Sequence, residues 1–578
     1  METEADIAGW WLDGDILHIG EISIGTGSRV GTRAMMMPDS VVEAYAHVEP
    51  GTCLVGTGSA QSGSRTLNFE TMTVPEGSWT RLRHTMSLLL LDIIPALAAL
   101  PTLGLLFLAI PDYSHSSRLF LAIFALAIPV AVLTVLCYAG IVVALVRFAS
   151  RYIHPGTYSW LGVEAWAAWL TYRLMWTSRE VLFPFYCSLL TPHWLRMLGA
   201  RVGLGVEAST ILGLPNLLDI DNGSFLADDV SLAPYQLGAG QIRLGTSCVS
   251  AKAFVGNSGI VEMEHSVPPG ALVGVLSTAP PPEIMKAGSS WLGRPAISLP
   301  RCVEDVADPS RTFYPSRRLK FARAFVESWR LLPLVCSSLL AELVGLGIFI
   351  IMSTLGFGWA VFAGGVMLLI AGLIACTLAT LAKWLLTPNV GPGQQHPLWS
   401  SFVWRHELSD TFVESLAVPW LGKLAYGTPL LTFWLRSLGA KIDSGVWLES
   451  HRVTEPDLLQ LDAGVTVNRQ CVLQSHLFHE RLMRLDTLHL RAGATLGPLS
   501  IGLPGVVIGC GTTVGPSSLI MRGEHIPDAT RWLGNPVQPW HDGKEDDVSK
   551  QYGEDSYGSS RGRANRKRRW GVPGDINS

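Results

Sequence analysis

The stretch LRAGATLGPLSIGLPGVVIGCGTTVGPSSLIMRGE, residues 490–524, repeats a pattern every six residues. The repeating position holds an aliphatic residue or, once, a glycine: Leu490, Leu496, Gly502, Ile508, Val514 and Ile520. A period of six fits neither the 3.6-residue turn of a helix nor the simple alternation of an amphipathic strand. It predicts the hexapeptide repeat of a parallel β-helix, in which three short strands complete one coil and the aliphatic residue points into a narrow core.

The same period opens the chain between residues 24 and 54. Its aliphatic positions are Ile24, Val30, Met36, Val42, Val48 and Leu54. Six hexads at three per coil predict about two coils. A run rich in Gly, Ser and Thr at residues 56–64 closes this first domain.

The composition points to a membrane protein. Of the 578 residues, 48% are hydrophobic and only 16% are charged, which is low for a soluble protein. The net charge of -4 argues against general nucleic-acid binding. The nine cysteines are scattered, odd in number and without a CxxC pair, so we expect neither a disulfide framework nor a metal site.

Four apolar stretches have the length of membrane spans, at residues 86–110, 119–146, 331–355 and 357–386. Each exceeds the roughly 20 residues needed to cross a bilayer, and they predict two helical hairpins. Lys and Arg flank the spans but are nearly absent from the hairpin tips, so the positive-inside rule places both termini in the cytoplasm. The Trp-rich segments that follow the hairpins are expected to be interfacial helices or linker helices packed on the soluble domains.

An internal duplication relates the middle of the chain to its end. Trp194–Ala200 matches Trp434–Ala440, and Trp291–Pro295 matches Trp532–Pro536. The first domain ends like these copies but lacks their opening helix and first coil.

The predicted fold is therefore three parallel left-handed β-helices, the first truncated, alternating with two transmembrane hairpins. The expected domains are 1–80 (truncated β-helix), 86–149 (hairpin), 150–194 (interfacial or linker helices), 195–300 (β-helix), 317–387 (hairpin), 388–433 (interfacial or linker helices), 434–540 (β-helix) and 541–578 (disordered basic tail).

Local motifs add a resemblance to a known family. Gln474–Leu488, Ser517–Pro527 and Arg531–Pro536 closely resemble the C-terminal region of the poly-ε-lysine synthetases, which are single-module nonribosomal peptide synthetases. Leu214–Tyr235 is similar to that family's middle domain. The resemblance implies a bacterial plasma-membrane protein whose tandem soluble domains join amino-acid monomers and are distantly related to hexapeptide-repeat acyltransferases. The left hand of the β-helices is taken from those acyltransferases.

The chain departs from this family pattern, since it has no adenylation domain, no carrier serine motif and two hairpins instead of three. The resemblance then implies no cofactor in this chain. Its substrate would be a phosphopantetheine-linked aminoacyl thioester presented by a separate adenylation and carrier protein. The other expected partners are the lipid bilayer and either the other β-helices, in an internal pseudo-trimer, or further copies in a homo-oligomer.

Forming an amide from a thioester requires a base for the amine proton and donors for the tetrahedral oxyanion. We predict His476 as the base, with Glu480 and Arg481 beside it. The alternative is that these residues only order a loop that interrupts the coils. The middle copy has Tyr235 at the position of His476, so the two copies cannot share one base, which suggests one active copy.

Candidate substrate-binding residues are Asp228, Asp229, Tyr235 and Glu524. The two aspartates could attract a cationic amino acid, or they could simply form a solvated turn. Three functions stay open from the sequence. They are a transferase that condenses carrier-bound aminoacyl thioesters, a membrane-anchored hexapeptide O- or N-acyltransferase, and a non-catalytic scaffold or synthetase remnant.

Overall fold

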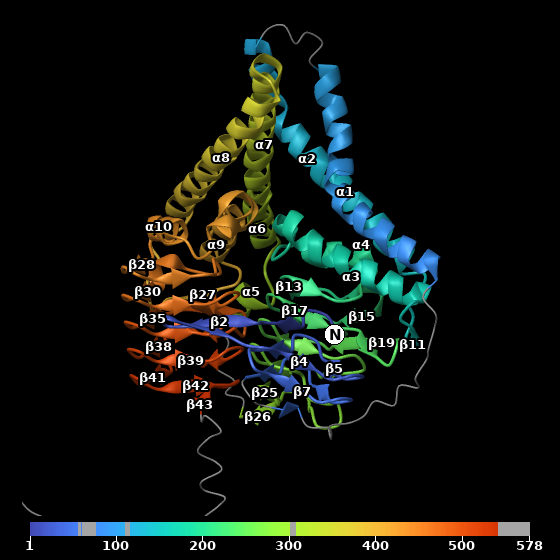
Figure 1. The fold of residues 1–578 in the computed structure, drawn as a ribbon, viewed down its shortest axis with the longest axis vertical. Coiled ribbons are helices and arrows are strands. Elements are labelled where there is room, and N and C mark those ends of the chain that lie inside the picture. The colour runs from blue at the N-terminus through green and yellow to red at the C-terminus, as the bar shows by residue number, and fades with distance from the viewer. Residues whose placement is uncertain (56–58, 61–76, 110–115, 301–307, 541–578) are drawn as a thin grey trace, which may run out of the picture. The chain divides into compact units, whose positions relative to one another are not determined.

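A computed structural model describes residues 1–55, 59–60, 77–109, 116–300 and 308–540 of the chain. The predicted disordered tail, 541–578, lies outside these residues, as does most of the Gly, Ser and Thr-rich run. Figure 1 shows short strands gathered at one end of the molecule and long helices extending from them at the other.

Four long helices correspond to the predicted spans. They are α1 (Ser78–Ala109), α2 (Ser116–Ala149), α7 (Leu332–Leu355) and α8 (Phe357–Leu386). All four contain segments long and apolar enough to cross a membrane. α1 packs against α2, α7 packs against α8, and α2 contacts α7. The association with a membrane is thus supported by length and apolarity, while the orientation across it stays a prediction.

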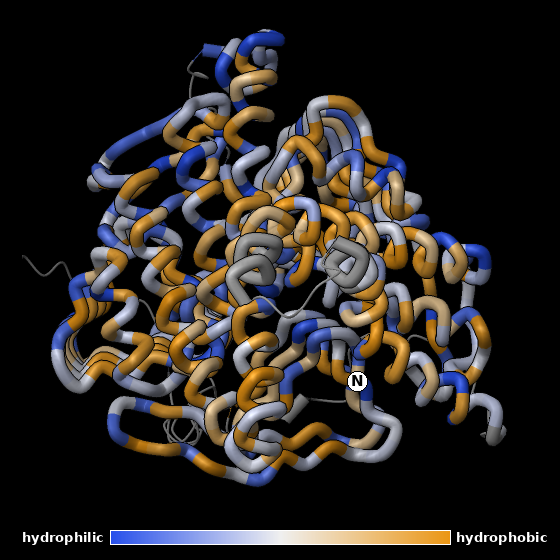
Figure 2. The backbone as a smooth tube through the Cα atoms, turned by 90° about the horizontal axis from the view of Figure 1, so that it is seen from above, coloured by the Kyte–Doolittle hydropathy of each residue, from blue (hydrophilic) through white to orange (hydrophobic). Residues whose placement is uncertain are grey.

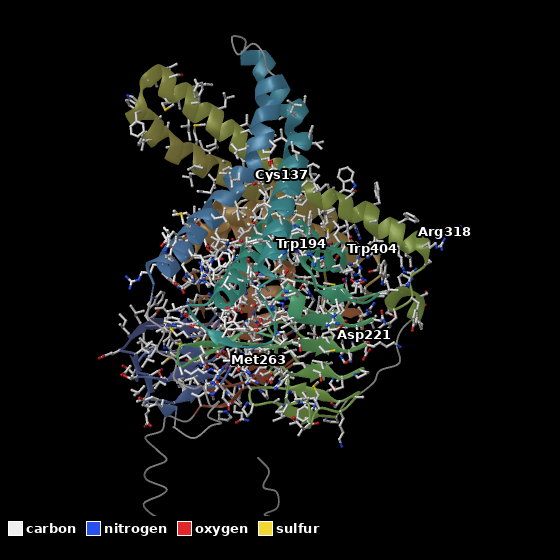
Figure 3. All side chains as sticks on the ribbon, turned by 90° about the vertical axis from the view of Figure 1, so that its right-hand side faces the viewer. Cys137, Trp194, Asp221, Met263, Arg318 and Trp404 are labelled. Atoms are coloured by element: carbon white, nitrogen blue, oxygen red, sulfur yellow. The ribbon has the colours of Figure 1, made fainter. Side chains whose placement is uncertain are left out.

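Shorter helices connect these spans to the strands. They are α3 (Val163–Val181), α4 (Thr191–Leu198), α5 (Pro309–Thr312), α6 (Arg317–Ser328), α9 (Ser401–Phe412), a π-helix (Val413–Gly422) and α10 (Pro429–Ser437). α3 packs on α2, and the π-helix packs on α8. In Figure 3, Trp194 and Trp404 lie where the helices meet the strands, whereas Asp221 and Met263 lie among the strands.

The short strands form three groups, which we call stack 1 (residues 1–60), stack 2 (201–299) and stack 3 (441–539). Most neighbouring strands are parallel, and their Cα partners are typically 18 residues apart, as in Met35 with Cys53, Leu272 with Ser290 and Ile501 with Leu519. The last strand of stack 2, Ile297–Leu299, instead pairs antiparallel with Ser290–Leu292. A spacing of 18 is three hexads per coil, as the sequence period predicts. Parallel coils are therefore confirmed, and their left hand stays a prediction.

The strand bounds follow the hexads. Stack 1 contains β1 (Asp6–Ile7), β4 (Ser23–Ile24), β5 (Arg29–Val30), β6 (Met35–Met36), β7 (Val41–Val42), β8 (His47–Val48), β9 (Cys53–Leu54) and β10 (Ser59–Ala60). Stack 2 contains β12 (Arg201–Val202), β13 (Glu207–Ala208), β14 (Ile211–Leu212), β15 (Leu218–Ile220), β16 (Phe225–Leu226), β17 (Val230–Leu232), β20 (Ser247–Val249), β21 (Phe254–Val255), β22 (Ile260–Val261), β23 (Ser266–Val267), β24 (Leu272–Val273), β25 (Ser290–Leu292) and β26 (Ile297–Leu299). Stack 3 contains β28 (Lys441–Ile442), β29 (Trp447–Leu448), β30 (Leu459–Leu461), β31 (Thr466–Val467), β32 (Val472–Leu473), β35 (Leu488–Leu490), β36 (Thr495–Leu496), β37 (Ile501–Gly502), β38 (Val507–Ile508), β39 (Thr513–Val514), β40 (Leu519–Ile520), β41 (His525–Ile526), β42 (Arg531–Leu533) and β43 (Gln538–Pro539).

One coil in each stack is longer. There the Cα partners are 29 residues apart, as in Asp6 with Met35, Leu218 with Ser247 and Thr466 with Thr495. The additional residues form an antiparallel hairpin that leaves the coil. The three hairpins are β2 (Trp10–Asp13) with β3 (Ile16–Ile19), β18 (Gln236–Gly238) with β19 (Gln241–Leu244), and β33 (His476–His479) with β34 (Leu482–Leu485). Stack 1 thus retains the hairpin of the other two.

The hexad residues fill the cores of the stacks. Val30, Met36, Leu490 and Val514 are each at most 2% exposed. Burying an aliphatic side chain of this size contributes about 1.5–3 kcal/mol, repeated along each coil. Figure 2, seen from above, shows hydrophobic residues recurring along coils and helices.

Each hairpin contacts the next stack. The stack 1 hairpin reaches stack 3, where the backbone N–H of Leu12 donates to Asn468 Oδ1 at 2.9 Å. The stack 2 hairpin reaches stack 1, where the N–H of Leu237 donates to Glu2 Oε1 at 3.1 Å. The stack 3 hairpin reaches stack 2, where Arg481 Nη2 donates to the carbonyl of Gly205 at 2.8 Å. The three stacks are thereby linked in a closed circle.

Candidate active site

A groove with polar side chains lies where the hairpin of stack 3 meets stack 2. We call it the reactive groove. Its lining includes the polar side chains of Cys187, Asp228, His406, Glu407, Gln474 and His476. They come from the segment before α4, from both stacks and from α9. Phe478 of the hairpin packs against Phe225 of stack 2, with ring centres 5.6 Å apart, and so holds the two walls together.

A carboxylate shared by two histidines forms one wall. Glu455 is fully buried. Its Oε1 lies 2.5 Å from His476 Nδ1 and 3.0 Å from His406 Nε2, and its Oε2 accepts from the Ser475 hydroxyl at 2.9 Å. Among the residues that the structure describes, His476 Nε2 has no hydrogen-bond partner. His476 therefore resembles an oriented general base, with one ring nitrogen fixed by a carboxylate and the other available.

The electrostatics of this wall favour a carboxylate next to a basic imidazole. Burial would raise the pKa of Glu455, but the two histidines hold it well below its usual range. Burial would lower the pKa of His476, but Glu455 raises it above its ordinary value. On α9, burial raises the pKa of Asp410 to about 7, with His406 opposing the rise. α9 thus places a carboxyl group with a pKa near neutral pH beside this pair of histidines.

The opposite wall has a carboxylate from stack 2 and a thiol from the segment before α4. Asp228 Oδ1 accepts hydrogen bonds from the hydroxyls of Ser209 and Thr210. The Cys187 sulfur lies 3.7 Å from the same oxygen. Burial, with Asp228 nearby, raises the pKa of Cys187 well above its ordinary value. Cys187 is thus a neutral thiol at physiological pH, whereas a nucleophilic cysteine needs a lowered pKa.

A chain of amides crosses the groove between the walls. The backbone N–H of Asp228 donates to Asn257 Oδ1 at 3.1 Å, and Asn257 Nδ2 donates to Gln474 Oε1 at 3.1 Å. This fixes the orientation of the Gln474 amide. Within the described ranges, Gln474 Nε2 donates to no other group, so its N–H bonds are available to a ligand.

The groove is also tied to the membrane-spanning helices. Arg330, between α6 and α7, is almost fully buried. It donates to Glu407 Oε2 at 2.7 Å and to the carbonyl of Tyr186, next to Cys187, at 2.9 Å. Burial raises the pKa of Glu407 to about 7, although Arg323 and Arg330 oppose the rise.

Of the candidates from the sequence, His476 and Asp228 line the reactive groove together. Glu480 and Arg481 occupy the hairpin turn, both with positive φ, as a type I′ turn requires. Arg481 donates to the carbonyls of Gly205 and Gly223. These contacts fit the alternative in which the pair orders the hairpin.

The remaining candidates lie elsewhere. Asp229 pairs with Arg33 and Arg179 at 3.1 and 2.6 Å, and these pairs hold down its pKa against the effect of burial. Tyr235 packs edge-on against Tyr172. Glu524 accepts from the backbone N–H of Met521 in its own turn. The structure therefore gives these three residues local structural contacts outside the groove.

Sequence reasoning missed Glu455, His406 and Cys187. One signal was present for Glu455, because the Pro-Asp-Leu turn that follows it matches the Pro-Asn-Leu turn after Leu214 in the middle copy. A buried leucine in one copy and a buried glutamate in the other mark a functional difference. His406 and Cys187 carry no such signal, since they lie outside the repeats.

Comparison with known proteins gives one relative along nearly the whole chain. The chain is 29% identical, over 554 residues, to a delta-poly-L-ornithine synthetase of Acinetobacter baumannii (strain AB307-0294). The match covers 91% of this chain and 41% of the relative, so the chain spans about two fifths of that protein's length. No family model matches.

Two solved structures align with shorter parts of the chain. A hexapeptide-repeat acetyltransferase from Vibrio cholerae has a TM-score of 0.18 at 11% identity, covering 29% of this chain and 91% of its own. AntD, an N-acyltransferase from Bacillus cereus, has a TM-score of 0.14 at 14% identity, covering 21% and 94%. The match to the delta-poly-L-ornithine synthetase confirms the resemblance of this chain to poly-amino-acid synthetases.

Proposed function

We propose that this chain is a membrane-bound transferase that forms an amide bond between a carrier-bound aminoacyl thioester and an amine, with His476 as the general base. One observation carries the proposal. The buried carboxylate of Glu455 holds His476 Nδ1 at 2.5 Å, while the imidazole lines a groove between two β-helical stacks.

The reaction balances without a further co-reactant. The amine nitrogen attacks the thioester carbonyl carbon, and His476 Nε2 takes the proton that the nitrogen loses. The tetrahedral intermediate then expels the thiolate as the carbon–sulfur bond breaks, and His476 returns the proton to the sulfur. The products are one amide and one free thiol. Glu455 stabilises the imidazolium that exists between the two proton transfers.

Two further groups of the groove fit this reaction. The Gln474 amide, oriented by Asn257, is positioned to donate to the oxyanion. The Asp228 carboxylate, opposite His476, suits an ammonium group on the substrate. Since the relative is named for a polymer of ornithine, we infer a basic amino acid as the monomer. Its thioester would be carried by phosphopantetheine on a separate carrier protein.

Cys187 supports direct transfer over a covalent acyl-enzyme. Although it lines the groove, burial and Asp228 keep it in the thiol form, so it is a poor nucleophile at neutral pH. Cys187→Ala is therefore expected to retain the transfer activity.

The test uses the purified full chain in detergent with a carrier protein loaded with ornithine or lysine. Amide product is followed by mass spectrometry, and released thiol is measured in parallel. His476→Ala should lower the rate by about 10²–10⁴-fold, the usual contribution of a general base. His489→Ala is a matched control, because His489 Nε2 also pairs with a carboxylate, Asp462 at 3.0 Å, but neither residue lines the groove.

The outcomes separate the functions that the sequence left open. Product with wild type and with His489→Ala, but not with His476→Ala, supports the proposal. Transfer from a small acyl thioester but from no loaded carrier would replace it with a hexapeptide acyltransferase. No product from either donor would favour a scaffold or remnant.

A further inference from the structure

A second groove lies where the hairpin of stack 1 meets stack 3. We call it the indole groove. Its lining includes Trp10, Leu12, Asp15, Leu17, Trp447 and Thr466. Both tryptophans are about 40% exposed, and the groove has a free volume of about 580 Å³. The groove thus combines two accessible indoles with the carboxylate of Asp15, which suits a ligand with apolar and cationic parts.

The strand register shows that the two grooves are counterparts. β1 pairs with β6 as β32 pairs with β37. Trp10 follows β1 by three residues and begins its hairpin, and His476 follows β32 by three residues and begins the equivalent hairpin. The indole of Trp10 therefore takes the place of the imidazole of the proposed base.

The stack that contacts the hairpin also has corresponding residues in the two grooves. β29 pairs with β31 as β13 pairs with β16, which makes Trp447 the counterpart of Glu207, a residue that also lines the reactive groove. Within the hairpins, Leu12 and Leu17 correspond to Phe478 and Met483 of the reactive groove. The shape of the site is thus repeated, but Trp10 and Trp447 stand where the reactive groove has His476 and Glu207. Such a groove can bind without reacting.

The charges around the indole groove leave one carboxylate available. Arg469 lies 5.9 Å from the Trp10 ring centre, but it pairs with Asp6 at 3.0 Å. Asp13 pairs with Arg531 at 3.2 Å. Asp15 forms no ion pair with any other residue that the structure describes, and it is exposed at the hairpin turn.

We propose that the indole groove binds the alkylammonium side chains of a cationic amide oligomer and holds the oligomer without reacting with it. Indole faces attract ammonium groups, Leu12 and Leu17 suit the methylene stem, and Asp15 supplies the opposite charge. The inference rests on the proposed function, since it takes the oligomer to be the product or acceptor of the reactive groove.

The test measures binding of a short ornithine oligomer to the full chain in detergent by calorimetry. The protein carries His476→Ala, so that turnover cannot consume the ligand. Trp10→Leu and Trp447→Leu each keep an apolar side chain but remove an indole, and each should weaken binding by about two- to fivefold. Asp15→Asn should weaken it by a similar factor and reduce the salt dependence of binding. Trp160→Leu is a matched control at an exposed tryptophan outside the groove.

An oligomer of the same length with acetylated side-chain amines provides the ligand control and should bind much more weakly. Unchanged affinity in the Trp10→Leu, Trp447→Leu double variant, or equal binding of the acetylated oligomer, would overturn the inference. Failure of the proposed function is distinguishable, because it would appear as absence of transfer by the wild type while binding to this groove persists.

Discussion

The middle and last stacks share a backbone plan but differ in chemistry. Both follow a helix with the Trp-Leu-Arg motif, both contain a 29-residue coil with a hairpin, and both end in a Trp-Leu-Gly turn. At two corresponding positions they diverge, with Leu214 and Tyr235 in the middle copy and Glu455 and His476 in the last. The comparison teaches that the hexads specify the coil, whereas positions at hairpins and coil corners are free to acquire function.

Stack 1 extends the comparison to a third hairpin. Its first residue is Trp10, which faces stack 3 in the indole groove. At corresponding positions the three hairpins thus have Trp10, Tyr235, which directly precedes β18, and His476. Histidine is the side chain of these three with an ordinary pKa near 6.5, so one groove of the circle has a base suited to neutral pH.

Exchanging the two divergent residues should erase the difference between the copies. The variant with Glu455→Leu and His476→Tyr gives the last stack the residues of the middle one. We expect the transfer rate to fall by about 10²–10⁴-fold, because the base is lost, as measured by amide product from a loaded carrier. Tyr235→Phe serves as the control at the corresponding position and should keep the wild-type rate. Retained activity in the double variant would show that the chemistry runs elsewhere.

A variant that removes only the charge of Glu455 tests whether this carboxylate sets the pKa of His476. In Glu455→Gln the imidazole remains buried, but the group that raises its pKa is neutral. The pKa of His476 should therefore fall, and the rate should begin to rise at a lower pH than in the wild type. The maximal rate should drop on the order of tenfold, because a less basic imidazole is a weaker acceptor of the proton. A pH profile of the transfer rate measures both effects, and an unshifted acid limb would contradict the assignment of His476 as the titrating base.

The shared backbone predicts that equivalent hexad positions respond alike. Ile508 and Val267 are at most 1% exposed in their stacks. Ile508→Ala should lower the free energy of unfolding by about 2–5 kcal/mol. Val267→Ala removes fewer carbons and should cost less. Thermal unfolding of the detergent-solubilised chain measures both, with the exposed Val41→Ala as the control. A marked loss in one stack with none in the other would show that the two cores are not equivalent.

Much of the architecture was predictable from the sequence. The six-residue period gave the parallel coils, because an aliphatic side chain must return to the same narrow core at every hexad. The four apolar stretches gave the long helices, because a bilayer demands that length. His476 was predicted as the base that amide formation requires, and the duplication then showed that the middle copy has Tyr235 in its place.

Only the tertiary structure decided which residues surround His476. Glu455 lies 21 residues before His476, and His406 lies on a helix outside the repeats. In the folded chain both histidines contact the same oxygen of Glu455. Asp228 reaches the same groove from another stack, and Cys187 reaches it from the segment before α4. A period of six specifies how a coil stacks on itself but carries no information on which stack receives a hairpin. That choice depends on the packing of surfaces distant in sequence, and here it places a base, an amide donor and a carboxylate around one groove.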